Sequence, residues 1–399
     1  MTGDRPGYEV FVRQVPRAPG AARVTPGREK GTLMKTLITA ALAAGLTAAT
    51  ASAEDLPCGN FAIGFDFTAL DVLTPILRGE GGEAAIDAAL DLPSVQAIVR
   101  KQTQIHEDRS TSGRLREELV AWQAGTEADI EDPVYPFPDD ETLDAMEAAL
   151  TALRADPDAL MAPACERLSA YVPAGYDTPL QSVFVMGVNS AGFAFGDPVL
   201  YIGFHRMHDD LPALELVLVH ELYHGAQGAM RPVPEGLEEA LSDTDWRALQ
   251  YLNYGYLEGS ATWVADPADF EGDGEMLAYF QERLARGVNE RANLFTLFEA
   301  SLYQLANDPT TDPLRHYFAG FTGEERNYNV GYIIAREIEA NYGRERLAEV
   351  MRESPTVFYR LYAEAENRNG PELSDTFIGI LDRIDAALAA TGIDPVLEP

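Results

Sequence analysis

Histidine and positive charge are both scarce in this chain of 399 residues. Only six histidines are available for chemistry that needs an imidazole, and 30 Lys and Arg face 64 Asp and Glu, a net charge of −34. So acidic a protein repels nucleic acid and anionic lipid, and we therefore expect neither as a partner. The charge says nothing about the fold, which has to be inferred from the hydrophobic pattern.

Cysteine is scarcer still, because Cys58 and Cys165 are the only two, and neither has metal-ligand spacing. An even number of cysteines in an oxidising compartment favours a disulfide. Such a bond would close a loop of over 100 residues, for which the chain-entropy model gives up to about 4.7 kcal/mol of stabilisation. Two buried free thiols are the alternative.

Long apolar runs are also missing, except near the start of the chain. Residues 34–53 have the short basic start, the apolar core and, in Ala51-Ser52-Ala53, the cleavage site of a secretory signal peptide. We expect cleavage before Glu54, no stable membrane insertion afterwards, and a periplasmic or secreted protein with a net charge of −38. Residues 1–33 then either precede the true start of translation at Met34 or form a disordered extension.

Hydrophobic spacing predicts helices over most of the chain. Apolar residues recur at i, i+3 and i+4 from Ile63 to Leu168, and again from Glu275 onward. Two β-favouring runs, Val183–Val188 and Val199–Phe204, are joined by a connection rich in Gly, Asn and Ser. The predicted fold class is therefore mainly α (α+β), with a small β-sheet and helical layers before and after it. The expected helical segments include Phe67–Leu77, Ala84–Leu90, Val95–Gln104, Leu115–Trp122, Leu143–Leu153, Met161–Leu168, Trp246–Ala265, Phe295–Leu305, Val330–Ala340, Arg346–Met351 and Phe377–Leu388.

The most informative motif is His220-Glu221-Leu222-Tyr223-His224, shortly after the second β-favouring run. Asp210 as a cap, Pro212 in the first turn and Gly225 close behind the second histidine predict a helix here. A helix places residues four apart on one face, about 6 Å from each other, so both imidazoles can reach a single metal ion. Glu221 projects beside them, where a carboxylate can take a proton from water. The alternative is a pair of core histidines that flank an incidental glutamate.

Two histidines need a third protein ligand to hold zinc. The candidates that follow are Glu239, Asp243 and Glu258. We favour Glu258, because it is the only charged side chain between Ala248 and Ala265 in the long helix expected there, and burial of a lone carboxylate needs a compensating cation or donors. Gly255, Gly259 and Ala261 would let this helix approach the motif helix closely. We therefore expect one Zn²⁺ per chain, and a carboxylate held by Tyr hydroxyls or an Arg is the alternative.

The motifs together resemble the gluzincin clan, especially zinc-dependent peptidases of bacteria. The resemblance rests on His-Glu-x-x-His, on Glu258-Gly259-Ser260-Ala261 in the next long helix, and on Tyr328–Ala335 followed by Asn341–Arg344. It implies a zincin-like catalytic region, which we place over residues 176–399. The resemblance does not extend to residues 54–175, which the hydrophobic spacing predicts as a helical N-terminal region. It also implies that His220, His224 and Glu258 bind the zinc ion, and that the partner of the site is a peptide or protein substrate.

In the mechanism that this resemblance implies, Glu221 is the general base for hydrolysis of a peptide bond. Tyr328, Tyr332 or His316 would donate a hydrogen bond to the oxyanion that develops. Tyr332 lies one helical turn after Tyr328, so we expect only one of the two to face the metal. Two other functions remain open: a catalytically inactive zincin-fold protein that acts as an exported binding module, and a metal-dependent amidase with a non-peptide substrate.

Two further features of the sequence could be metal sites, but we interpret both as ordinary loop residues. His205 and His208 could assist a second metal site, but a pair at i, i+3 outside a clear helix is more typical of loop histidines. The acidic stretch 266–275 lacks the spacing of an EF-hand, so we interpret it as a solvated loop rather than a calcium site. The oligomeric state leaves no signal in the sequence.

Overall fold

The computed structural model describes residues 56–195, 198–230, 234, 236–321 and 325–393. The predicted signal peptide, the residues before it and the expected new N-terminus at Glu54 lie outside these ranges. Helices dominate, beside one five-stranded sheet, so the predicted α+β class is confirmed. None of the helices in the described ranges has the length and apolar content needed to cross a membrane.

The helices match the hydrophobic spacing closely, because every segment predicted as helical above lies almost entirely within helix. The bounds are α1 Thr68–Leu77, α2 Gly82–Leu90, α3 Pro93–His106, α4 Ser112–Ala124, α5 Asp140–Ala155, α6 Asp158–Ser169, α7 Leu211–Met230, α8 Leu237–Ala240, α9 Asp243–Val264, α10 Glu275–Asn289, α11 Arg291–Asn307, α12 Pro313–Phe321, α13 Arg326–Tyr342, α14 Arg344–Glu349, α15 Pro355–Glu364 and α16 Asp375–Thr391.

The sheet has the order β1-β2-β3-β5-β4, with a parallel centre and antiparallel edges. Its strands are β1 Leu56–Cys58, β2 Phe61–Asp66, β3 Leu180–Val185, β4 Gly192–Ala194 and β5 Val199–Gly203. The prediction of strands at β3 and β5 is confirmed. The short β4 lies in the connection between them, where no strand was predicted.

One part of the sequence prediction is wrong. The segment 63–66 was included in the helical series, but it belongs to β2, whose Phe61, Ile63 and Phe65 alternate into the core. Strand β2 pairs with β3 in parallel, with Ile63 opposite Leu180. The sheet therefore takes strands from both sides of the expected boundary at residue 175.

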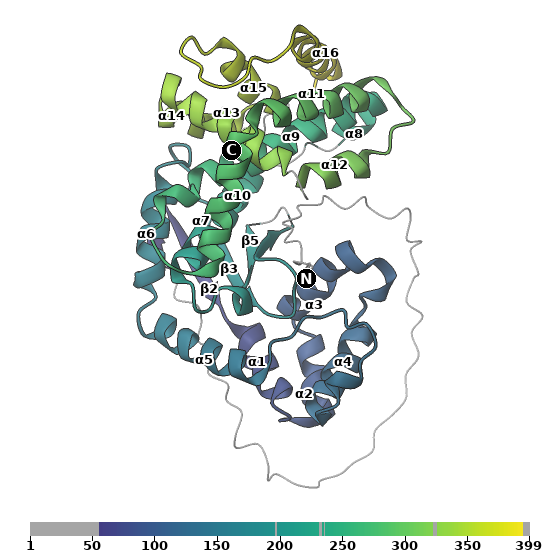
Figure 1. Cartoon of the computed structure of the whole chain (residues 1–399), viewed down its shortest axis with the longest axis vertical. Helices are drawn as coiled ribbons and strands as arrows, with labels where there is room; N and C mark the ends of the chain where they lie inside the picture. The colour runs from purple at the N-terminus through teal and green to yellow at the C-terminus, as the bar shows by residue number, and fades with distance from the viewer. Residues whose placement is uncertain (1–55, 196–197, 231–233, 235, 322–324, 394–399) are drawn as a thin grey trace, which may run out of the picture.

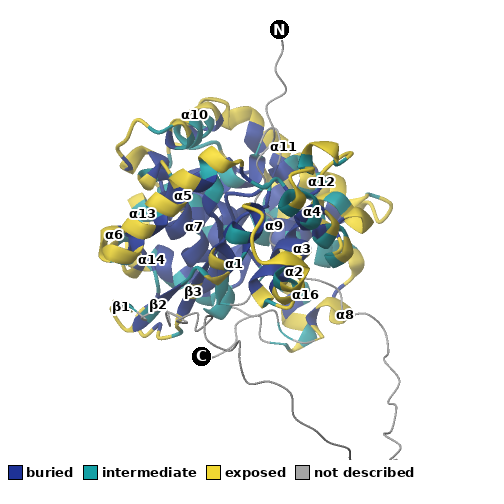
Figure 2. Cartoon of the chain, turned by 90° about the horizontal axis from the view of Figure 1, so that it is seen from below, coloured by how far each residue is buried: buried dark blue, intermediate teal, exposed yellow. Residues whose placement is uncertain are grey.

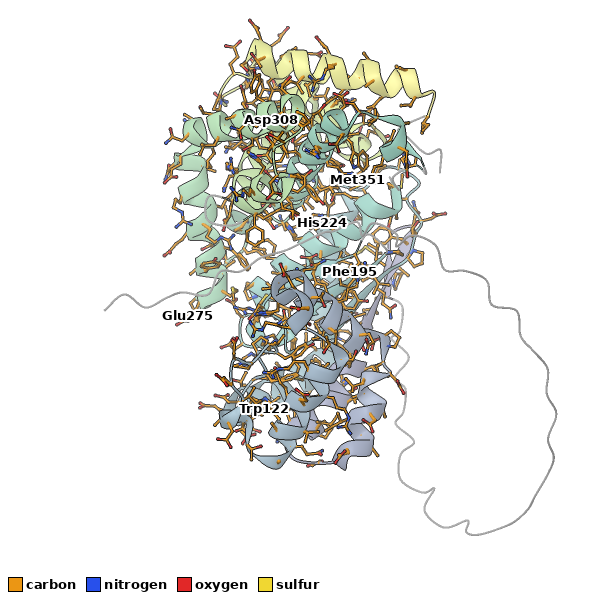
Figure 3. The ribbon with its side chains drawn as sticks, turned by 90° about the vertical axis from the view of Figure 1, so that its right-hand side faces the viewer. Trp122, Phe195, His224, Glu275, Asp308 and Met351 are labelled. Carbon is orange, nitrogen blue, oxygen red and sulfur yellow. A yellow bond between two sulfur atoms is a disulfide. The ribbon has the colours of Figure 1, made fainter. Side chains whose placement is uncertain are left out.

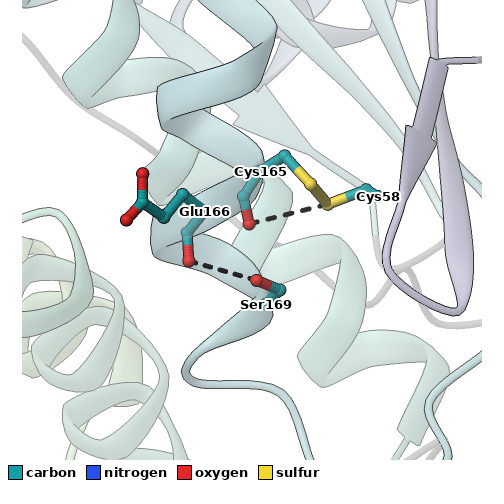
Figure 4. The surroundings of a disulfide bond; sticks show 4 residues. All are labelled: Cys58, Cys165, Glu166 and Ser169. Carbon is teal, nitrogen blue, oxygen red and sulfur yellow. Dashed lines mark hydrogen bonds between the residues drawn. A yellow bond between two sulfur atoms is a disulfide. The ribbon is translucent and has the colours of Figure 1, made fainter.

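A disulfide ties the edge of the sheet to the N-terminal helices. Cys58 in β1 is bonded to Cys165 in α6, as Figure 4 shows. The predicted disulfide is confirmed, and the described residues hold no free cysteine.

The elements are arranged along the long axis of the molecule (Figure 1). Helices α1 to α5 lie at one end, the sheet and α7 lie in the middle, and α9 with α11 to α16 forms the other end. Figure 2 shows α7 at the buried centre of the fold. Its side chains from Leu216 to Gln227 are buried without interruption, because it packs against the sheet, α6 and α9 at once.

The start of α7 is fixed by a shared cap. Asp210 accepts the backbone N–H of Ala213 at 3.1 Å and that of Leu277 at 2.9 Å, so one carboxylate holds the first turns of both α7 and α10. The predicted role of Asp210 is confirmed. Gly225, in contrast, does not end the helix: a Cβ there would lie 2.9 Å from a methyl group of Leu180, so glycine lets α7 approach the sheet.

The glycines of α9 act on a different neighbour from the one expected. A Cβ on Gly259 would lie 2.1 Å from the Cα of Gly331, and a Cβ on Gly331 would lie 2.0 Å from the carbonyl oxygen of Gly255. Gly259 thus brings α9 against α13, whereas a Cβ on Gly255 would meet Tyr359 of α15 and Phe298 of α11. The expectation that the two glycines serve the approach to the motif helix is wrong, and the contact of Gly259 with Gly331 instead fixes α13 close to Glu258.

Candidate metal centre

Three predicted ligand side chains converge where α7 crosses α9. The Nε2 atoms of His220 and His224 are 3.1 Å apart, and Glu258 Oε2 lies 3.2 Å from His224 Nε2 and 3.4 Å from His220 Nε2. Figure 3 places His224 midway along the molecule, between the end marked by Trp122 and the end marked by Asp308. The structure therefore brings together the two histidines of the motif and the glutamate of the following long helix.

The spacing of these atoms suits a tetrahedral zinc ion. Ligands about 2.0–2.1 Å from a tetrahedral centre are separated by about 3.3–3.4 Å from each other. The three separations here fall between 3.1 and 3.4 Å. Two imidazoles and one carboxylate are also a donor set of catalytic zinc sites, in which the fourth position stays open. Geometry and donor chemistry therefore fit the implied metal.

Hydrogen bonds hold the histidines in the tautomer that a metal needs. His224 Nδ1 donates to Gln227 Oε1 at 2.8 Å, which leaves Nε2 free to coordinate. The Gln227 side chain donates in turn to Ser260 Oγ at 2.8 Å. Sequence reasoning missed Gln227; the signal was a lone amide three residues after His224 on an otherwise apolar helix. The imidazole of His220 donates a hydrogen bond to the backbone carbonyl of Ala261 in α9.

The two glutamates of the site have opposite electrostatic surroundings. Burial by itself would raise the pKa of Glu258, but the facing imidazoles of His224 and His220 outweigh burial and lower that pKa to about 2. Burial raises the pKa of Glu221 to about 8, because the opposing effect of His224 is smaller there. The surroundings of Glu258 thus favour its carboxylate form, whereas burial of Glu221 opposes its charge.

Glu221 is completely buried and uncommitted. Its exposed fraction is 0 %, and neither carboxylate oxygen has a hydrogen-bond partner among the residues that the structure describes. The edge strand β4 packs directly on it, since a Cβ on Gly192 would lie 2.5 Å from both Cγ and Oε1 of Glu221. Both oxygens are therefore available to a water molecule or a substrate.

A buried lysine links the N-terminal helices to this carboxylate. Lys101 of α3 is completely buried, with its ammonium 5.4 Å from the ring centroid of Phe193 in β4. Its positive charge acts to lower the pKa of Glu221, against the larger effect of burial. Sequence reasoning missed Lys101, because nothing in the pattern of α3 distinguishes a buried lysine from a surface one.

We call His220, His224 and Glu258 the metal-site cluster. Of the three residues predicted as oxyanion donors, Tyr328 is the one that lies beside it. Its ring stacks on His220 with centroids 6.3 Å apart, and burial followed by the charge of Glu258 raises its pKa well above the ordinary value. The hydroxyl of Tyr332 instead donates to Asp266 Oδ2 at 2.8 Å. His316 lies on α12 and does not line the pocket beside the cluster.

The other residues weighed as ligands lie elsewhere. Glu239 is exposed on α8, and Asp243 forms an ion pair with Arg247 at 2.6 Å. Across the described ranges, His220, His224 and Glu258 are the one group of three or more potential ligands close enough to share a metal. His205 and His208 are therefore not part of a second group, and His208 Nδ1 only meets the carbonyl of His205, at 3.2 Å.

A pocket opens beside the cluster, between α7, α9, α10 and α13. It reaches His220 and Glu221, so a molecule in the pocket meets both an imidazole of the converging group and the carboxylate of Glu221. Its walls are formed by Ala191, Leu216, Val217, His220, Glu221, Thr262, Ala265, Pro267, Phe280, Arg283, Leu284, Glu325, Tyr328 and Asn329.

Comparison with known proteins adds one finding. The family described as "Putative zinc dependent peptidase (DUF5700)" matches residues 86–370, which is more than half of the chain and includes all three converging side chains. No curated protein and no solved structure matches. On this match, the chain belongs to the family of putative zinc dependent peptidases.

Proposed function

We propose that this protein hydrolyses peptide bonds at a gluzincin-type site in which His220, His224 and Glu258 hold one Zn²⁺. The observation that carries the proposal is the triangle of donor atoms, 3.1–3.4 Å on each side, with the uncommitted carboxylate of Glu221 beside it. A site that only bound a metal would have no use for such a carboxylate. The family match supports the zinc dependence and the peptidase class.

In this proposal each side chain has a separate task. A bound Zn²⁺ would supply a Lewis acid that polarises the scissile carbonyl and lowers the pKa of water to about 7. Glu221 accepts the proton of the attacking water and delivers it to the leaving nitrogen. Tyr328 donates a hydrogen bond to the oxygen on which negative charge develops. Gln227 keeps His224 oriented.

A peptide suits the site better than a small amide, because an edge strand runs past it. Strand β4 is the last strand in the order of the sheet, so its outer edge has no partner strand among the described residues. It also passes directly over Glu221 at Gly192. An extended peptide could therefore pair with β4 through backbone hydrogen bonds and present its scissile bond to the carboxylate.

We also propose that the protein acts outside the cytoplasm. The Cys58–Cys165 disulfide supports this, because such bonds persist in oxidising compartments. Mass spectrometry of the exported protein tests it: we expect an N-terminus at Glu54, and a retained Met1 or Met34 would refute it.

The proposed activity is tested with purified protein, its metal content and a denatured protein substrate. We expect about one zinc per chain, hydrolysis of the substrate, and loss of hydrolysis with a chelator that zinc reverses. Zinc without hydrolysis of any peptide would favour the binding module, and hydrolysis of non-peptide amides alone would favour the amidase. Hydrolysis that persists after the metal is removed would contradict the proposal.

A further inference from the structure

One ion pair lies in the wall of the pocket beside the metal-site cluster. Arg283 of α10 donates from Nε to Glu325 Oε2 at 2.7 Å, and its Nη2 forms an ion pair with Glu325 Oε1. Its Nη1 donates to the hydroxyl of Tyr279 at 2.8 Å. All three guanidinium nitrogens and both carboxylate oxygens are thus engaged, and both side chains are largely buried.

The remainder of that wall is mainly apolar. Leu216 and Val217 come from the turn of α7 just before His220, and Phe280 and Leu284 come from α10. The carboxylate of Asp210 joins the first turns of α7 and α10, so these two walls are tied to each other at one end. Away from His220 and Glu221, the pocket therefore offers a mainly apolar surface whose one ion pair carries no net charge.

The pair is what makes the wall neutral. An unpaired Arg283 would turn the same surface into a site for a carboxylate, since a guanidinium binds carboxylates through paired hydrogen bonds. With Glu325 in place, an acidic side chain in the pocket would meet a carboxylate, and a basic one would meet a guanidinium. A charged substrate side chain would lose its hydration in the pocket without gaining an ion pair in return.

We propose that this pocket binds an apolar side chain of the substrate next to the scissile bond, and that Glu325 sets this specificity by neutralising Arg283. The inference rests on the proposed peptidase function, because His220 of the metal-site cluster and Glu221 both line the pocket. Glu325 has no contact with the reacting atoms in this scheme. It acts through Arg283.

The test uses internally quenched peptides of one sequence, in which either residue beside the scissile bond is Leu, Phe, Asp or Lys. We expect the wild-type protein to prefer Leu or Phe over Asp and Lys in kcat/KM by at least about tenfold at one of the two positions. In Glu325→Gln the exposed guanidinium should shift that position toward Asp, again by about tenfold or more. A flat wild-type profile, or an unchanged profile in Glu325→Gln, would overturn the inference.

A matched control separates neutralisation of Arg283 from general effects of removing a glutamate. Glu339 of α13 pairs with Arg344 at 3.1 Å and does not line the pocket, so Glu339→Gln should keep the wild-type profile. Leu284→Phe provides a second test that leaves the ion pair intact. The larger side chain narrows the pocket. We therefore expect kcat/KM for the Phe peptide to fall relative to the Leu peptide, while the Asp peptide remains a poor substrate.

Binding distinguishes failure of this inference from failure of the proposed function. The same peptides, labelled with fluorescein, are titrated against Glu221→Gln and against Glu221→Gln combined with Glu325→Gln. If the wild type cleaves no peptide but the Leu peptide binds and the second substitution shifts binding toward Asp, the pocket assignment stands and the peptidase proposal falls. Equal binding of all four peptides would overturn the pocket assignment, whatever the activity.

Discussion

Two buried glutamates, one in the N-terminal helices and one at the metal-site cluster, show how the two regions of this molecule differ. Glu118 of α4 is 1 % exposed and accepts hydrogen bonds from Arg114 Nε at 2.7 Å and from the backbone N–H groups of Val134 and Tyr135 at 2.8 and 3.1 Å. Glu221 of α7 is 0 % exposed and accepts none from the described residues. Burial is the same, and only the partners differ.

Glu118 thus has the surroundings of a carboxylate that stabilises the fold, whereas Glu221 has those of a carboxylate that is available for a reaction. A buried charge with a full set of donors stabilises the loop that it binds, here the segment of Val134 and Tyr135. A buried carboxyl group without hydrogen-bond partners costs stability in either protonation state, so its presence has to be explained by something that it does. Glu258 is an intermediate case, because two imidazoles face it in an arrangement that also suits a metal.

The largest expected effect on stability comes from Glu118. Glu118→Ala leaves Arg114 and two backbone N–H groups without their acceptor, so we expect the free energy of unfolding to fall by about 3–5 kcal/mol. Glu117 is the control: it is exposed and lies 3.8 Å from Arg114, so Glu117→Ala should cost at most about 1 kcal/mol. Denaturant titration measures both, and equal losses would remove the distinction.

Tyr328 and Tyr332 of α13 should differ in the same way, one acting in the reaction and the other only in stability. Tyr328→Phe should lower turnover by about 10²–10³-fold, because it removes a donor to the developing oxyanion. Tyr332→Phe removes a hydrogen bond to Asp266 outside the cluster, so turnover should stay unchanged while stability falls by about 0.5–1.5 kcal/mol. A turnover defect confined to Tyr332→Phe would reverse the assignment.

A smaller effect is expected from the residue that orients His224. Gln227→Ala should weaken zinc affinity by about 10–100-fold, because the imidazole loses the acceptor that fixes its tautomer. Gln281 offers a matched control, since its side chain donates to the carbonyls of Pro267 and Phe270 and not to a ligand histidine. Competition with a zinc chelator gives both affinities. Equal affinities for the two variants would show that Gln227 does not act on the metal.

The sequence alone was sufficient to predict those features of the site that are determined within a single helix. The four-residue spacing of His220 and His224 is set by helical geometry, and Glu258 was distinguished by being the one charge on its stretch of α9. All three residues were therefore found from local pattern. The same pattern gave the bounds of most helices, because hydrophobic periodicity is local as well.

Sequence reasoning failed where the outcome depends on how elements pack. Tyr328 and Tyr332 lie one helical turn apart on α13, and the packing of α13 against α9 places Tyr328 beside His220 and Tyr332 beside Asp266. The role of Lys101 depends on the docking of α3 against β4, and β4 itself is a strand only because it pairs with β5. Such long-range contacts leave no periodic signal in the chain.

The central claim is that Glu221 and Glu258 have different tasks, and the most direct measurement is the zinc content and turnover of the Glu221→Gln and Glu258→Gln variants side by side. We predict that Glu221→Gln keeps zinc and a near-normal melting temperature while turnover falls by about 10²–10⁴-fold, because the amide keeps the shape but cannot accept a proton. Glu258→Gln should lose zinc and turnover together, since a neutral amide is a poor zinc ligand. Undiminished zinc binding in Glu258→Gln, or unchanged turnover in Glu221→Gln, would contradict the account.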